Sequence, residues 1–545
     1  MRRSPVRPLH PGLLAGGLFA LVAAAWSPVR AEVPPVDDAG ARALAATLKS
    51  GLTRWFPPAA EDGEGLGFEW EGEPTVKPAG DHYDVALPRL SAEDSEGTRI
   101  EFGTVLLTVT PRDAGLFGIA VTMPSKIAVQ HLDEEEEDYA EVANLTLGRQ
   151  SFTGTWSAPL ENLLTVDAAY NDLTVTAAGD AGKVTIGSLT LVQDLKPDGA
   201  TTFSGPVALA IGAVAATNDK KQEMFKLAGL AVENSYVRAD LAKIGALQKL
   251  SQKYSAAGKT PTAQEILPML HGLIGGFSGK VRLTGLSVLG GGETPNVSLG
   301  QMSFQGGVED LDQALSTVRF GMEARDFAMT PSMTPPAFTP TAMNLELSAA
   351  KLPNAALWQT FSDLIVAAEA EEKAKEAKEA KPAAKDKKAK TPPPPPAPSA
   401  ADVAMQKTMA ALIEAGTELR LDSMKVDTPA TAGNATGALR VAANAPQGVT
   451  GGAVILLRGL DAAVKAMQPA PGTQPDPDTQ NMLGMVGMLQ ALGQVSKDDT
   501  GAEIRSYKID MTETGQLLLN GADMAPLLAA GNPPPPAAEP PKKKK

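Results

Sequence analysis

The sequence feature that most constrains the fold is the alternation of apolar with small or polar residues along short segments separated by turns. The expected hairpins join residues 105–110 to 117–123, 184–192 to 201–211, and 504–511 to 517–520. A period of two places one face of each strand against a core and leaves the other in water. The pattern therefore predicts open antiparallel sheets.

Apolar residues also recur at helical spacing between these strands. The expected helices cover residues 37–56, 241–250, 261–274, 400–415 and 478–495. Pro268 should kink or shorten the third of them. Four of the five precede a hairpin or meander, which indicates a helix-then-sheet unit used several times. The expected fold class is α+β, mainly antiparallel β, with elongated multi-hairpin sheets interrupted by short helices.

Four strand segments share a second pattern, in which the apolar parity flips across one position. Gly187 and Gly300 occupy this position in two segments, and Thr284 and Asp422 occupy it in two others. A parity flip within a strand predicts a β-bulge or kink. We interpret the pattern as repeated kinks rather than as a true sequence repeat.

Composition divides the chain further. The expected parts are a signal peptide at 1–31, an N-terminal β-rich domain at 32–235, a helical pair with a β-meander at 236–353, a charged helix and Pro-rich linker at 354–400, a helix and hairpin region at 401–530, and a Pro/Lys tail at 531–545. Residues 369–399 are an Ala/Glu/Lys run followed by polyproline, and are predicted to include a disordered insert.

The first residues predict export. Arg2, Arg3 and Arg7 precede an uncharged apolar run at 13–26, and Ala31 ends a small-residue cleavage site. Cleavage there would leave the protein in the periplasm. An uncleaved signal that anchors the chain in the inner membrane is the alternative.

Composition and motifs give little support to catalysis. The chain has no cysteine and a formal net charge of −14, which disfavours nucleic acid as a partner. His82, His131 and His271 are far apart in sequence, and the acidic run at 133–138 lacks the ligand pattern of a calcium loop. We expect no metal, no cofactor and no catalytic residue. A hydrolase using paired carboxylates remains the alternative.

The most distinctive surface is predicted on the helix at 478–495, which carries Met482, Met485 and Met488. Methionine side chains form adaptable apolar surfaces that suit lipid tails or varied peptides. The predicted apolar-ligand residues are Met482, Met485, Val486, Leu489, Leu492, Ile266, Leu270 and Leu273. Ordinary core packing is the competing interpretation. Lipid or an envelope protein is the expected partner, and residues 542–545, all lysine, could add peripheral membrane contact.

The closing segments 506–511 and 515–521 resemble the end of the YdgA-like family of bacterial envelope proteins. The resemblance implies a long β-rich body broken by helices and a non-enzymatic role in the envelope. The Ala/Glu/Lys and polyproline insert departs from that family's pattern. The function expected from the sequence is binding or scaffolding in the periplasm, with lipid-like ligands held in a β groove. A purely structural, partner-binding protein is a further alternative.

Overall fold

The computed structural model describes residues 33, 35–56, 66–133, 138–255, 260–290, 295–332, 335–379, 400–468, 477–499 and 501–526. The expected signal peptide, the insert beyond Glu379 and the Pro/Lys tail lie outside these residues. The chain divides into two compact units, unit 1 up to Gln301 and unit 2 from Met302. Strand β17 (Asn296–Glu309) includes the division point.

Unit 1 is mainly antiparallel β, as the alternation predicts. Its helices are α2 (Asp38–Trp55), α3 (Leu241–Ser255) and α4 (Ala263–Leu270). Its first strands are β1 (Leu66–Glu71), β2 (Thr75–Ala79), β3 (His82–Ala86), β4 (Arg89–Asp94), β5 (Thr98–Gly103), β6 (Leu106–Pro111), β7 (Leu116–Thr122), β8 (Lys126–Asp133) and β9 (Asp138–Thr146). The later strands are β10 (Arg149–Ser157), β11 (Asn162–Ala177), β12 (Gly182–Asp194), β13 (Lys196–Pro197), β14 (Thr202–Asn218), β15 (Glu223–Asp240) and β16 (Gly276–Val288).

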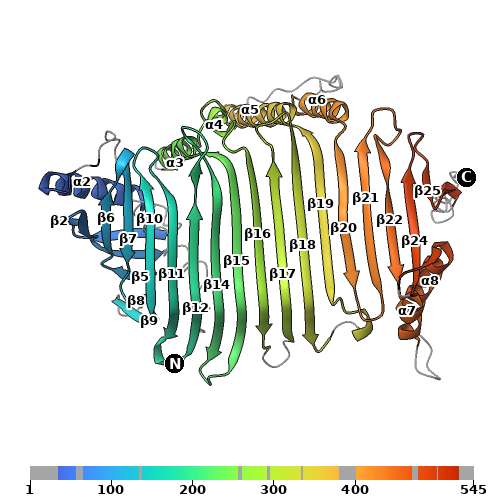
Figure 1. Cartoon of the computed structure of the whole chain (residues 1–545), viewed down its shortest axis with the longest axis horizontal. Coiled ribbons are helices and arrows are strands. Elements are labelled where there is room, and N and C mark those ends of the chain that lie inside the picture. Colours follow the sequence, from blue (N-terminus) through green and yellow to red (C-terminus); the bar gives the residue numbers. More distant parts are fainter. Residues whose placement is uncertain are drawn as a thin grey trace, which may run out of the picture. The chain divides into compact units, whose positions relative to one another are not determined.

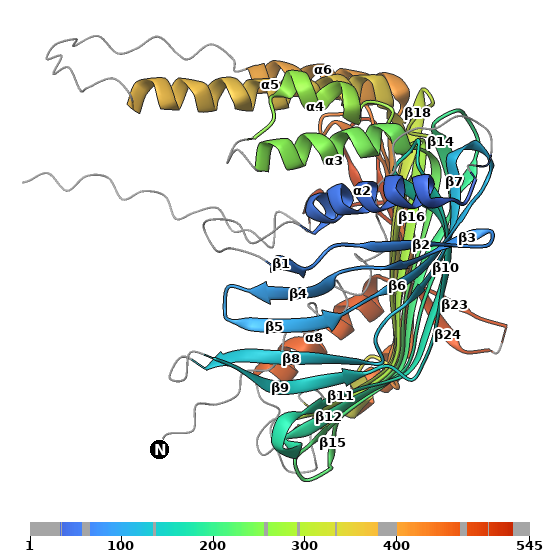
Figure 2. The same cartoon turned by 90° about the vertical axis from the view of Figure 1, so that its left-hand side faces the viewer.

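The sheet of unit 1 forks at β11. One half of β11 pairs with β10, which leads through β7, β6 and β3 to β2; the other half pairs with β9, which leads through β8, β5 and β4 to β1. On its far side β11 continues into the ladder β12, β14, β15 and β16. Figure 2 shows β4, β5, β8 and β9 leaving this ladder on the side that also carries α2 and α3.

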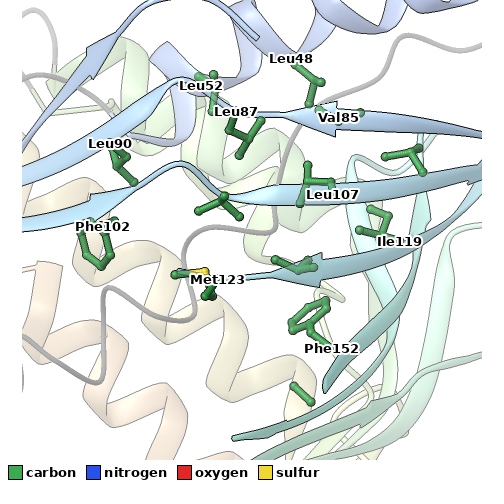
Figure 3. Packing of buried hydrophobic residues seen from close by; sticks show 14 of the residues in the cluster. Leu48, Leu52, Val85, Leu87, Leu90, Phe102, Leu107, Ile119, Met123 and Phe152 are labelled. Atoms are coloured by element: carbon green, nitrogen blue, oxygen red, sulfur yellow. The ribbon is translucent and has the colours of Figure 1, made fainter. Parts of the chain in front are cut away.

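The core of unit 1 fills the fork. Helix α2 begins at its N-cap Asp37, whose carboxylate accepts the Gly40 N–H at 2.7 Å. Leu44, Leu48 and Leu52 recur every four residues on α2 and are buried against the strands. Figure 3 shows Leu48 and Leu52 beside strand residues such as Val85, Leu87 and Leu107. Burial of this apolar surface supplies the main driving force for folding unit 1.

Kinks are present at or beside three of the four predicted positions, namely Gly187, Thr284 and Asp422, and the kink expected at Gly300 stays a prediction. Asp172, Gly187, Ala213, Ala228 and Gly285 form a row across β11, β12, β14, β15 and β16 that the ladder skips, while the pairs on both sides keep their register. Three of them have positive φ, at 56° for Asp172, 52° for Ala213 and 60° for Gly285. The kink in β16 lies at Gly285, one residue beyond the predicted Thr284. Because of this row, Leu189 and Ile186 of β12 pack against the same core although three residues separate them.

Unit 2 is also mainly antiparallel β (Figure 1). Its strands beyond β17 are β18 (Leu315–Thr330), β19 (Ala342–Pro353), β20 (Glu418–Asp427), β21 (Ala432–Val441), β22 (Val449–Arg458), β23 (Gln494–Lys497), β24 (Glu503–Met511), β25 (Leu517–Leu519) and β26 (Ala522–Asp523). Its helices are α5 (Asn354–Glu379), α6 (Ala400–Ala415), α7 (Leu460–Met467) and α8 (Pro477–Leu492). The ladder runs β18–β19–β20–β21–β22–β24, with β23 and β25 both on β24.

Several sequence predictions are confirmed, and three predicted helix ends are wrong. The helix expected at 241–250 continues to Ser255. The three predicted hairpins form, and Asp422 lies in a bulge where β20 places two residues opposite one residue of β21. The helix expected at 261–274 ends at Leu270, because His271 is extended and Gly272 takes φ 63°. The helix expected at 478–495 ends at Leu492, where β23 begins two residues later.

Candidate apolar binding surface

The two faces of the unit 2 sheet differ sharply in chemistry. Paired residues in an antiparallel ladder point to the same face, so the registers assign each side chain. The apolar face carries Val318, Phe320 and Met322 of β18, Met343, Leu345, Leu347 and Ala349 of β19, Leu419, Leu421, Met424 and Val426 of β20, Ala435 and Leu439 of β21, Ala453, Ile455 and Leu457 of β22, and Tyr507, Ile509 and Met511 of β24. The polar face carries Arg319, Glu323, Glu346, Arg420, Lys425, Thr436, Lys508 and Asp510.

The bulge at Asp422 keeps β20 in this arrangement. Leu419 and Leu421 precede it and Met424 and Val426 follow it, and all four pair with apolar residues of β19 or β21. If the same sequence formed a regular strand without the bulge, Met424 and Val426 would turn to the polar face. The parity flip in the sequence therefore serves to keep one face apolar.

The apolar face is exposed to an unusual degree. Leu315 and Phe327, near the two ends of β18, are more than a third exposed. Among the other large apolar side chains of this ladder that are exposed to that degree, the apolar face holds Val318, Phe320, Met343, Leu347, Leu419, Met424 and Leu439. The polar face holds Val454. Leu419 alone leaves 51% of its surface exposed. Contiguous apolar surface of this kind marks a binding surface in soluble proteins.

A groove of about 320 Å³ lies within the apolar face. It runs across the strands between two rows of side chains, one through Leu419, Leu439 and Met511, the other through Leu347, Leu421 and Ile509. Two residues along a strand separate the rows, which corresponds to about 7 Å. The volume falls in the range of small-ligand pockets, roughly 300 to 1,000 Å³.

Small residues at the centre of the rows create the groove. Gly437, Gly451 and Ala453 hold the row positions on β21 and β22, where a larger side chain would fill the space. Gly451 has φ 148°, and a Cβ there would lie 2.0 Å from the Ala438 carbonyl oxygen, so only glycine fits. The groove therefore has leucine walls and a floor of glycine and alanine, brought together by the pairing of β20, β21 and β22.

Helix α8 is fixed over the other end of the apolar face. The Tyr507 hydroxyl donates to the Leu489 carbonyl at 2.7 Å, and the Arg505 guanidinium donates to the Gln490 carbonyl. Asn520 donates to the Leu492 carbonyl at 2.9 Å. The Leu489 carbonyl also accepts the Gly493 N–H at 3.1 Å, and the Gln490 and Leu492 carbonyls are among those that a helix C-terminus leaves without a partner in the helix. The end of α8 is thereby held beside the apolar face.

The predicted residues of α8 share one side of the helix. At about 100° per residue, Met482, Met485, Val486, Leu489 and Leu492 fall within one third of the circumference, and Met488 lies about 40° beyond the edge of this stripe that Leu492 marks. Val486, Leu489 and Leu492 are half-buried, while Met482 and Met485 are 44% and 56% exposed. The stripe thus changes from half-buried at its anchored end to exposed at its start.

The other predicted residues belong to unit 1. Ile266 and Leu270 lie on one side of α4, half-buried, and Leu273 follows the helix in the turn after Gly272. Leu273 therefore does not share the helical face of the other two, because the helix ends before it. The structure therefore places Ile266 and Leu270 together on α4, and the five predicted residues of α8 together on that helix.

Unit 1 has a charged pocket of about 660 Å³ on β1, β4 and β5. Arg99 contacts Glu101 at 2.8 Å and Glu69 at 3.3 Å, and Arg89 contacts Glu71 at 3.4 Å. Burial lowers the pKa of the Arg99 guanidinium, but the carboxylates of Glu101 and Glu69 outweigh it and the pKa rises. The pocket is an ion-pair network in which Arg89 and Arg99 are paired with three carboxylates, those of Glu69, Glu71 and Glu101.

Two features of the described residues bear on the hydrolase alternative, the pKa values of the carboxyl groups and the places of the histidines. Every carboxyl group with a resolved pKa shift is lowered, namely Glu73, Asp81, Glu265 and Glu418, whereas a general acid needs a raised pKa. His82, His131 and His271 lie on β3, on β8 and after α4. Within the described ranges, no three metal-ligating side chains gather as a metal site would require.

Comparison with protein-family models, with curated sequences and with solved structures finds no match for this chain. The resemblance of the closing hairpin to the YdgA-like family stays a prediction. Among the helices of the described residues, none is long and apolar enough to cross a membrane.

Proposed function

We propose that this protein binds lipid in the bacterial envelope without catalysing a reaction, and that the groove on the apolar face of unit 2 holds the hydrocarbon chain. The observation that carries the proposal is the exposure of seven large apolar side chains on one face of a sheet whose other face is charged. The large exposed apolar area suits a ligand that has no polar groups along its length.

Hydrocarbon fits the groove better than a peptide does. The backbone N–H and C=O groups of β19, β20, β21 and β22 are already engaged in the ladder on both sides of each strand. A peptide in the groove would bury its own backbone polar groups without partners, which costs free energy for each group. An acyl chain carries no such groups, and the two rows of side chains about 7 Å apart can contact it on both sides.

The length of the face also suits an acyl chain. Six strands from β18 to β24 span roughly 24 Å at about 4.8 Å per strand. Half of a bilayer's hydrocarbon core is about 15 Å thick. A chain lying across the strands can therefore remain on the apolar face for its whole length.

The test compares two substitutions on neighbouring residues of β22. Ala453→Phe places a ring in the groove, whereas Val454→Phe places the same ring on the polar face. Protein purified from its host without detergent is analysed by native mass spectrometry and solvent extraction. We expect near-stoichiometric lipid in the wild type and the Val454→Phe variant, and loss of most of it in the Ala453→Phe variant. Lipid-free wild-type protein would contradict the proposal.

The location is part of the same proposal. A periplasmic protein cleaved after Ala31 would meet lipids of both envelope membranes, and an intact mass that begins at Glu32 would support this location. A mass that retains the first 31 residues would favour an inner-membrane anchor.

A further inference from the structure

Helices α5 and α6 carry a second apolar surface that the sequence did not single out. The two helices are antiparallel, since α5 leaves the sheet after β19 and α6 returns to it before β20. The hydroxyls of Thr360 and Thr408 are in contact, and Ala404 is 2% exposed, so these residues mark the line where the helices touch. Figure 2 shows the pair projecting on the side of the strands where α8 lies, which is the side of the apolar face.

Four exposed apolar residues lie on one side of this pair, and we call them the hairpin stripe: Phe361, Leu364, Met405 and Met409. At about 100° per residue, Leu364 and Phe361 lie about 40° and 100° around α5 from Thr360, and Met405 and Met409 lie about 60° and 100° around α6 from Thr408. In antiparallel helices, equal rotations from the contact line lead to the same side. In Figure 1 α6 lies to the right of α5, and α5 runs away from the viewer, as Figure 2 shows from the side. Because α-helices are right-handed, the side of the pair that carries the stripe then faces the space over the apolar face rather than the space beyond the strand ends.

The stripe is too far from the sheet to touch a single chain in the groove. Phe361 lies seven residues into α5 and Met409 six residues before the end of α6, or about 10 Å along each helix; Leu364 and Met405 lie at about 15 Å. Sheet side chains occupy about 5 Å above the backbone, half the spacing of packed sheets. One hydrocarbon layer in contact with them adds about 4 Å. The stripe therefore stands level with a second layer.

We infer, on the basis of the proposed function, that the site holds two hydrocarbon layers and takes a lipid with two acyl chains. One chain lies in the groove, and the second lies above it against the hairpin stripe. The residues of the stripe are between 38% exposed (Leu364) and 58% exposed (Met405). The second acyl chain would cover this exposed apolar surface. Single-chain lipids contact the groove alone.

The chain offers matched controls for this inference. Val366 and Val403 are also exposed, at 52% and 41%, but each lies two residues, or about 200°, from a residue of the stripe on the same helix. Leu364→Asp and Val366→Asp therefore place the same charge on opposite sides of α5. Met405→Asp and Val403→Asp do the same on α6. Far-UV circular dichroism of each variant checks that the helices remain folded, and Leu364→Gln replaces Leu364→Asp if they do not.

The experiment measures competition against a fluorescent diacyl phospholipid, using the full chain freed of lipid. We expect Leu364→Asp and Met405→Asp to lower the affinity for a diacyl phospholipid by at least about tenfold. The affinity for the matching lysophospholipid should stay as in the wild-type protein. Val366→Asp and Val403→Asp should change neither of these two affinities. Unchanged diacyl binding in all four variants, or conversion of a dimer to a monomer by Leu364→Asp, would overturn the inference. The Ala453→Phe variant separates the proposed function from the inference about the hairpin stripe. It should lower the affinity for both lipids even if the stripe has no role.

Discussion

At the scale of single residues, the clearest electrostatic feature is the Glu265 carboxylate at the start of α4. It accepts the Tyr254 hydroxyl at 2.6 Å, and the Thr262 N–H and hydroxyl at 3.1 and 2.8 Å. The hydrogen bond from Tyr254 is the largest cause that lowers the pKa of Glu265 to about 2, followed by the bonds from Thr262. The contacts favour the charged form and join α3 to the first turn of α4.

This arrangement predicts that α4 loosens in acid. The pKa of Glu265 in the folded state is about 2, below the ordinary glutamate value of 4.5, so its contribution to stability is present above about pH 4.5 and is lost as pH falls towards 2. Hydrogen-exchange protection factors of the α4 amides should fall over that range. Glu265→Gln keeps the capping geometry without titrating and should show little change. A parallel fall in both proteins would contradict the assignment.

Two glycines of unit 1 should respond in opposite ways to alanine. Gly285 has φ 60°, and a Cβ there would lie 2.6 Å from the Cβ of Ala228, so Gly285→Ala should lower the free energy of unfolding by about 2 kcal/mol. Gly245 lies in α3 with 3.8 Å to the nearest neighbour, so Gly245→Ala should raise it by up to about 1 kcal/mol. Urea unfolding followed by tryptophan fluorescence measures both. Equal effects would mean that the kink row does not constrain the sheet.

At the scale of elements, local periodicity predicts most helices and strands but not all their ends. Gly272 ends α4 early because its left-handed backbone breaks the helix, although Leu273 continues the apolar spacing. Helix α7 was not predicted, yet its buried Leu460, Ala463 and Met467 have helical spacing. Short helices carry only two or three such residues, and the pattern is easily missed.

The candidate site was predictable only in part, and the reason is physical. The α8 residues lie within one helix, so their shared side can be derived from sequence spacing alone. The groove instead depends on which residue of β20 faces which residue of β21 and β22. Leu421 pairs with Gly437, and Gly437 with Ala453, so the three become neighbours only through two successive strand pairings, each of which joins residues 16 positions apart (437 − 421 and 453 − 437). The hint available in the sequence was the parity flip at Asp422, which shows that one face must stay apolar.

At the scale of the whole molecule, the two units differ in how they bury apolar surface. The two clusters of buried apolar side chains found among the described residues both belong to unit 1, where Trp156 is 0% exposed. In the described part of unit 2, most buried apolar residues are alanines, and the larger ones are Leu460, Met467, Ile504 and Tyr507. Burial of large side chains is the main source of folding free energy. Unit 2 therefore gains less from its own side chains.

A bound ligand would supply the missing burial, which gives the last prediction. Anything that binds only the folded state raises its stability in proportion to the logarithm of ligand concentration over Kd, by about 2.7 kcal/mol at a hundredfold excess. Removing lipid should therefore lower the melting temperature of unit 2 by several degrees and leave that of unit 1 unchanged. Differential scanning calorimetry resolves this as two transitions, of which the lower one moves back up when a diacyl phospholipid is added. The Ala453→Phe variant provides the control, since its lower transition should not respond to lipid. If lipid changes neither melting temperature of the wild-type protein, unit 2 is stable through its own strand pairings. Its apolar face then serves a partner other than hydrocarbon.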